Sequence, residues 1–164
     1  ASTEIYHLAH HDDIVIFSFD RGIVLVDFWH TLAYLTINCD TADYCGRGID
    51  LYSSNNPDFN YVNVRCKTAY DGGGMFFSNS SPTLTDVTFN DNTADYGGGG
   101  MYLYSSSPTT LTDVTFSGNR VYDGGGMFFI NPSPTLTDST FNDNSLVIPG
   151  GGDRKGKCLH SSHT

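Results

Sequence analysis

The sequence of 164 residues has no glutamine, a single glutamate (Glu4) and a single tryptophan. Charged residues make up only 16% of it, whereas ordinary soluble domains have about 25%. Eight residues are basic and 18 are acidic, so the net charge is −10. Because nucleic acids are bound through clustered Lys and Arg, this balance excludes a nucleic-acid partner. No apolar run exceeds four residues, so we predict no membrane span, which needs about 20.

Small polar residues are abundant instead. Asp, Asn, Gly, Ser and Thr account for 80 positions, and these residues favour turns over helix interiors, which excludes a helical bundle. The 21 Phe and Tyr residues can bury a core, which argues against a disordered chain. The chain starts at Ala1 without Met, from which we expect either a removed leader or a fragment.

A unit of 26 residues repeats along the chain. It is marked by glycines that stand 26 positions apart without slippage: Gly22, Gly48, Gly74, Gly100, Gly126 and Gly152. Apolar positions recur in the same register, as in Met75, Met101 and Met127, or Phe89, Phe116 and Phe141. A single unit cannot close a core, but stacked units can bury each apolar row against the next.

Each unit contains two short strand patterns with alternating apolar residues, interrupted by Gly, Asp, Asn and Ser-Pro. We therefore predict an all-β, right-handed parallel β-helix (β-solenoid) of about six rungs. A single domain is expected over residues 1–152, with a degenerate first rung or cap at 1–21, divergent rungs at 22–67 and regular repeats at 68–144. Residues 153–164 form a basic C-terminal tail.

Two motifs mark each regular unit: a Gly-Gly-Gly-Met run, as at Gly72–Met75, and FxxN, as at Phe89–Asn92. In these motifs the chain resembles the repeats of polymorphic outer membrane proteins and, more widely, right-handed parallel β-helix proteins. The resemblance covers residues 68–144 best and departs from the family's usual Ala-Ile by having Gly-Met. It implies a β-solenoid on a cell surface or outside the cell, often in adhesins or stalks, and implies no catalytic site.

The glycines are expected to permit tight turns with positive φ. The Asn column is expected to end each turn by hydrogen bonding to the backbone. Its members are Asn92, Asn119 and Asn144.

Side chains next to the inward Met and Phe should point outward, in two neighbouring columns. These form an aromatic stripe that suggests an interface with a partner subunit, a surface for stacking sugar rings, or a face covered by the chain itself. Its residues are Tyr52, Phe76, Tyr102, Tyr104 and Phe128.

Cys39 and Cys66 hold the same repeat position on adjacent rungs, within reach of a disulfide. Cys45 and Cys158 remain, and they can pair within one chain or between subunits. A disulfide fits an oxidising compartment.

Other candidate sites rest on short patterns. The tail residues Arg154, Lys155 and Lys157 can dock on an acidic neighbour. Asn79-Ser80-Ser81 is a glycosylation sequon. A metal site at His7, His10 and His11 meets no known ligand spacing, and repeated aspartates such as Asp86, Asp113 and Asp138 leave Ca²⁺ possible without an EF-hand-type loop.

Four functions are then open. The first is a non-enzymatic structural protein, a filament or surface-layer subunit whose main partner is another copy of itself. The second is an adhesin that binds glycans through the aromatic stripe. The third is a polysaccharide lyase or hydrolase, for which the break in the repeat at Asp50, Asp58, Arg65 and Lys67 is the best candidate. The fourth is ice binding through the Thr-Leu-Thr triplets, although threonine is an ordinary strand residue. We favour the first.

Overall fold

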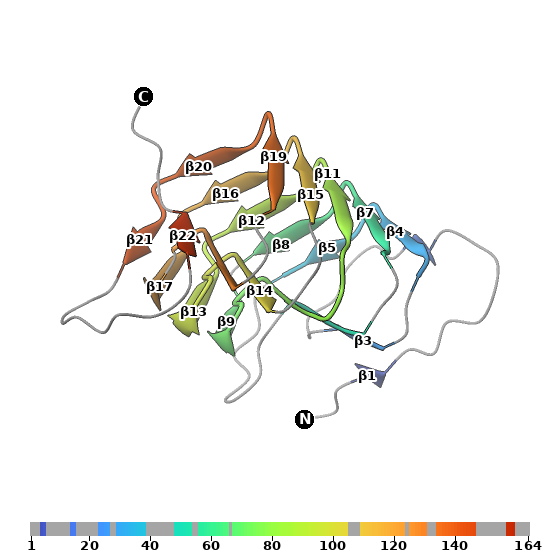
Figure 1. Cartoon of the computed structure of the whole chain (residues 1–164), viewed down its shortest axis with the longest axis horizontal. Coiled ribbons are helices and arrows are strands. Elements are labelled where there is room, and N and C mark those ends of the chain that lie inside the picture. The colour runs from blue at the N-terminus through green and yellow to red at the C-terminus, as the bar shows by residue number, and fades with distance from the viewer. Residues whose placement is uncertain are drawn as a thin grey trace.

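The computed structural model describes residues 4–5, 14–15, 23–26, 29–38, 48–53, 56–65, 67–104, 109–123, 125–130, 134–146 and 157–159. Short strands follow one another around a common axis and stack on those of the next turn (Figure 1). All of the strands that stack from turn to turn pair in parallel, as predicted for a β-solenoid. No helix among the described residues is long and apolar enough to span a membrane.

The strands form four sheets, which we name A to D in the order in which the chain visits them. Sheet A contains β1 (Glu4–Ile5), β3 (Ile23–Val26), β6 (Ile49–Tyr52), β10 (Met75–Ser78), β14 (Met101–Tyr104), β18 (Met127–Ile130) and β22 (Lys157–Leu159). Sheet B contains β2 (Ile14–Val15), β4 (Thr31–Ala33), β7 (Asp58–Asn60), β11 (Thr83–Thr85), β15 (Thr110–Thr112) and β19 (Thr135–Thr137).

Sheets C and D complete each turn. Sheet C contains β5 (Thr36–Ile37), β8 (Asn63–Arg65), β12 (Thr88–Asn90), β16 (Thr115–Ser117) and β20 (Thr140–Asn142). Sheet D contains β9 (Thr68–Asp71), β13 (Thr93–Gly97), β17 (Arg120–Asp123) and β21 (Ser145–Leu146).

Four turns carry a strand in every sheet, and they begin at β6, β10, β14 and β18. The turn before them has three described strands, and β1 and β2 belong to a still earlier one. The number of complete turns among the described residues is therefore lower than the predicted count of about six rungs. The glycine at position 152 suggested a sixth parallel turn, but β22 instead pairs antiparallel with β18, with Phe129 opposite Lys157.

The core is built from columns of like residues, as the repeat predicted. Met75 pairs in register with Met101, and Met101 with Met127, and all three are fully buried. Phe89, Phe116 and Phe141 form a continuous stack whose successive ring centroids lie 4.7 Å apart. This spacing matches the distance of about 4.8 Å between paired strands. The apolar side chains of each turn are therefore buried against those of the turn before.

The glycine runs have two structural roles, of which the sequence predicted one. Gly72 and Gly98 adopt positive φ, as expected. The glycines after them are required by close packing between turns instead. A Cβ on Gly100 would lie 2.6 Å from the carbonyl oxygen of Gly126, and one on Gly73 would lie 2.5 Å from that of Gly99.

The Asn column is confirmed and lies in the core. Asn119 donates from Nδ2 to the Phe89 carbonyl (2.9 Å) and to Oδ1 of Asn144 (2.8 Å). Asn92 Nδ2 donates in the same way to the Val64 carbonyl and to Oδ1 of Asn119, both at 3.0 Å. The side chains thus form a buried ladder that satisfies backbone carbonyls from turn to turn.

Candidate functional site

The aromatic column predicted on the outer face of sheet A is present. Phe76, Tyr102 and Phe128 occupy paired positions of β10, β14 and β18. The ring centroids of Phe76 and Tyr102 lie 5.3 Å apart, and those of Tyr102 and Phe128 lie 5.1 Å apart. Tyr52 extends the column, with its ring 5.8 Å from that of Phe76.

This stripe is less open than the sequence suggested. Phe76 is only 9% exposed and Phe128 only 5% exposed, so neither offers a free surface for a subunit or a sugar. One cause is an irregularity in β13 that brings backbone against the rings: a Cβ on Gly97 would lie 3.1 Å from Phe128 Cδ1 and 3.2 Å from Tyr102. The accessible part of the stripe is reduced to Tyr104, which is exposed, and the half-buried Tyr52 and Tyr102.

A second aromatic group lies at the corner between sheets B and C, where sequence reasoning placed no site. Tyr34 and Tyr61 are among the most exposed large side chains, at 61% and 53%. Their rings stack with centroids 5.0 Å apart and planes inclined by 8°. Both residues have a φ of 55°, in the left-handed region. Trp29, 54% exposed, precedes β4, whereas Tyr34 follows it.

The same corner position is occupied by aspartate in the three later turns. Asp86, Asp113 and Asp138 are all exposed, with φ of 54°, 54° and 48°. Aspartate adopts this conformation readily, whereas a tyrosine there is uncommon. The alignment of Tyr34 and Tyr61 with these aspartates could have revealed the aromatic pair, because each follows directly on a sheet B strand.

One core position in the last turn of the solenoid is exposed to solvent. Leu136 lies in the row of Leu84 and Leu111 but is 38% exposed, whereas those two are fully buried. All three residues of β19 are exposed. Within the described residues no strand follows β19, β20 or β21 in its sheet, and only β18 is covered, by β22.

The residues considered for a polysaccharide-cleaving site do not converge. Asp50 is on sheet A and buried, Asp58 is on sheet B and exposed, and Arg65 is on sheet C with its Nε 2.6 Å from Asn38 Oδ1. Lys67 is fully buried in the column that continues as the Asn ladder, where its backbone N–H donates to Asn92 Oδ1. Asp50, Asp58 and Arg65 therefore lie on strands of three different sheets, and Lys67 lies just before β9.

The remaining candidates are placed only in part. Asn79 of the sequon is exposed in a turn after β10, with φ of 52°. Several candidates lie outside the described residues: Cys39, Cys45 and Cys66, His7, His10 and His11, and Arg154 and Lys155. The backbone of Lys157 and Cys158 pairs with β18 of the same chain. In the part of the chain that the structure describes, no three His, Cys, Asp or Glu side chains gather as a metal site would require.

Comparison with known proteins places this architecture in a family. The profile of the right-handed beta helix region matches residues 9–163, which is almost the whole chain. No curated protein and no solved structure gave a match. The parallel pairing of successive turns agrees with a fold of this description. The chain therefore belongs to the right-handed β-helix proteins.

Proposed function

We propose that the protein is a non-enzymatic structural subunit of an extracellular or cell-surface assembly that grows by end-to-end packing of β-solenoids. The observation that carries this proposal is the open final turn, in which Leu136 holds a core position but remains 38% exposed. An exposed apolar row next to an unpaired strand edge favours addition of another strand.

The hydrogen-bonding groups of the β19 backbone are oriented so that another strand can be added. The N–H of Thr135 donates to Thr109 and the carbonyl of Thr137 accepts from Asp113, so these groups point back to the preceding turn. Since neighbouring residues of a strand direct their polar groups to opposite sides, the N–H and carbonyl of Leu136 point toward a following turn. A strand of a second copy can pair with them and cover the leucine.

The antiparallel strand β22 shapes how copies meet. It occupies the C-terminal edge of sheet A, so the incoming copy adds to sheets B, C and D. A contact of this kind joins the tail end of one copy to the head of the next, and such heterologous contacts propagate into filaments unless they close into a ring.

Negative-stain electron microscopy of the purified protein tests the proposal. We expect uniform filaments at high protein concentration, imaged with and without reductant to detect disulfides between copies. Leu136→Lys, which places a charge in the open row, should leave monomers. Thr112→Lys, on the outer face of an interior turn, is the matched control and should still assemble. Discrete short rods of the unaltered protein at every concentration would contradict the proposal.

A further inference from the structure

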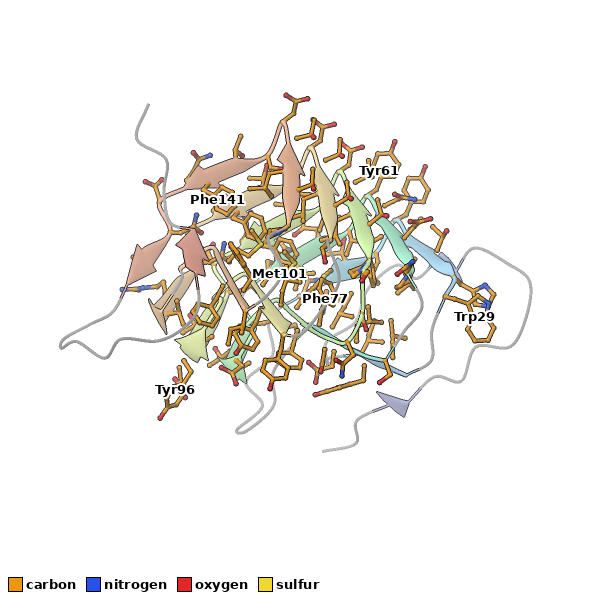
Figure 2. The ribbon with its side chains drawn as sticks, viewed as in Figure 1. Trp29, Tyr61, Phe77, Tyr96, Met101 and Phe141 are labelled. Carbon is orange, nitrogen blue, oxygen red and sulfur yellow. The ribbon has the colours of Figure 1, made fainter. Side chains whose placement is uncertain are left out.

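The outer face of sheet B is bounded by exposed aromatic side chains in its N-terminal turns. Trp29 stands before β4, while Tyr34 and Tyr61 stand after β4 and β7. In Figure 2, Trp29 and Tyr61 project at opposite ends of this pair of strands. Tyr34 follows Trp29 by five positions in the sequence, about 16 Å of extended chain. The aromatic groups thus bracket a surface, here called the aromatic platform, consisting of Trp29, Thr31, Tyr34, Asp58, Asn60 and Tyr61.

Two features show that stability does not account for the tyrosines of the platform. Both leave more than half of their surface in water, so they contribute little burial. Both also hold the left-handed backbone conformation, which the later turns give to aspartate. Backbone conformations of this kind concentrate at ligand-binding positions, where the surrounding fold supports them.

The fold holds the two tyrosines rigidly. The backbone N–H of Tyr34 donates to the carbonyl of Asn60 (3.0 Å), and that of Tyr61 donates to Thr85 (3.1 Å). The rings also stack on one another, which leaves their outward edges and the outer face of each ring toward solvent. A ligand therefore meets a surface that is already ordered, which lowers the entropic cost of binding.

The side chains between the aromatic groups define the chemistry of the ligand. Thr31, Asp58 and Asn60 supply a hydroxyl, a carboxylate and an amide, and none of the three is fully buried. No large aliphatic side chain lies among the outward residues of β4 and β7, unlike the apolar centre of a protein interface. The net charge of −10 disfavours an anionic polymer.

The corner adds an acceptor beside Tyr61. The next turn places the exposed Asp86 at the position of Tyr61, and aspartate is much the shorter side chain. A ligand ring against the outer face of Tyr61 would therefore extend over the shorter Asp86 side chain, whose carboxylate can accept hydrogen bonds from the ligand's hydroxyls.

We propose that the aromatic platform binds a neutral oligosaccharide. Sugar rings pack their C–H faces on Tyr61 and Trp29, while their hydroxyls bond to Thr31, Asp58 and Asn60. This function is separate from end-to-end assembly, because the platform lies on the side of the rod and leaves the β19 edge free.

Affinity electrophoresis of the full chain tests this, with hydroxyethylcellulose and mannan as neutral probes and polygalacturonate and polylysine as charged ones. We expect retardation by at least one neutral polymer only. Isothermal titration with cellohexaose, mannohexaose and chitohexaose then gives the affinity. Measuring the Leu136→Lys variant as well keeps failure of binding distinct from failure of assembly.

The decisive variant is Tyr34→Asp combined with Tyr61→Asp, because the later turns show that aspartate fits this corner. We expect an unchanged circular dichroism spectrum and a loss of affinity of about tenfold or more. Trp29→Ala should act in the same direction, whereas Tyr96→Ala, which removes an exposed tyrosine on sheet D, should have no effect. Absence of binding to any neutral polymer, unchanged affinity in the double variant, or retardation by polylysine alone would overturn the proposal.

Discussion

The turns before residue 68 and the three that follow share one backbone but differ in what they present to solvent. At the corner between sheets B and C, the early turns carry stacked tyrosines and the later turns carry aspartates. On sheet B, Asp58 and Asn60 stand where the later turns have threonines. The inward columns of sheets A, B and C stay apolar throughout. The repeat therefore constrains these columns strictly and leaves the corners and outer faces free to vary.

The contrast between a constrained core and variable outer faces can be tested by substitution. We expect the largest loss of stability in the Asn ladder. Asn119→Ala removes a side chain that donates to Phe89 and Asn144 and accepts from Asn92, all in the buried core. Leaving these groups unsatisfied should cost roughly 4 kcal/mol of the free energy of unfolding. Urea denaturation measures this. Asn142→Ala, on an exposed residue one turn further, should change stability by less than about 0.5 kcal/mol.

The next effect concerns the early turns alone. Thr36 pairs with Asn63, an offset of 27 positions that also separates Cys39 from Cys66. We predict that these cysteines are joined, which peptide mapping under non-reducing conditions will show. The loop they close is worth about 3 kcal/mol, so Cys39→Ser combined with Cys66→Ser should lower the melting temperature markedly. Cys39 mapped to Cys45 or Cys158 would refute the register of the first turns.

A smaller effect is expected at the glycine turns. Gly100→Ala places a methyl group 2.6 Å from the carbonyl of Gly126 and 2.7 Å from Phe116, so the stacked turns must separate locally. We expect a loss of about 2 kcal/mol in thermal or urea unfolding. Gly118→Asn supplies the comparison, because Gly118 has a φ of 65° that asparagine tolerates, and its Cβ would come closest to Oδ1 at the end of the exposed Asp91 side chain, which can rotate away. Equal losses in the two variants would mean that the turns around Gly100 adjust to the added methyl group and that close packing does not fix this glycine.

The smallest effect comes from exchanging the corner residues. Asp113→Tyr forces a tyrosine into the left-handed region without an aromatic neighbour on its flanking turns, and should cost about 1 kcal/mol. Tyr61→Asp relieves the same conformation but loses the stack with Tyr34, two effects of about 1 kcal/mol that oppose each other. Its melting temperature should therefore change little. A large loss would show that the tyrosine pair is structural.

Much of the fold could be predicted from the sequence because a β-solenoid is periodic. The 26-residue spacing of Gly74, Gly100 and Gly126 gave the register that pairs Met75 with Met101 and Met101 with Met127. Alternation then gave the inward and outward sides of sheet A. The Asn ladder was predicted from FxxN, although its burial was not, because polar residues are ordinarily expected at the surface.

The surfaces were harder to predict. Phe76 and Phe128 point outward as alternation requires, but the pattern does not show that an irregularity in β13 brings Gly97 against this column. Residues Lys157–Leu159 turn back and pair antiparallel with β18, which breaks the periodicity. The repeat pattern could therefore not predict this pairing. The aromatic platform depends on the left-handed backbone conformation of Tyr34 and Tyr61. That conformation could be predicted only by aligning the two tyrosines with the aspartates that occupy the same position in the later turns.

The Asn ladder also gives the rod a direction. One N–H of each linked amide donates in the C-terminal direction, from Asn92 Nδ2 to Asn119 Oδ1 and from Asn119 Nδ2 to Asn144 Oδ1, while Nδ2 also donates to a carbonyl of the preceding turn. The dipoles of the linked side chains therefore add rather than cancel. The parallel strands have the same sense. If copies assemble end to end as proposed, they all face one way, and their polymer has two chemically different tips. Like other polar polymers, it would elongate at unequal rates from its two ends. One end could then serve as the anchored base and the other as the growing tip.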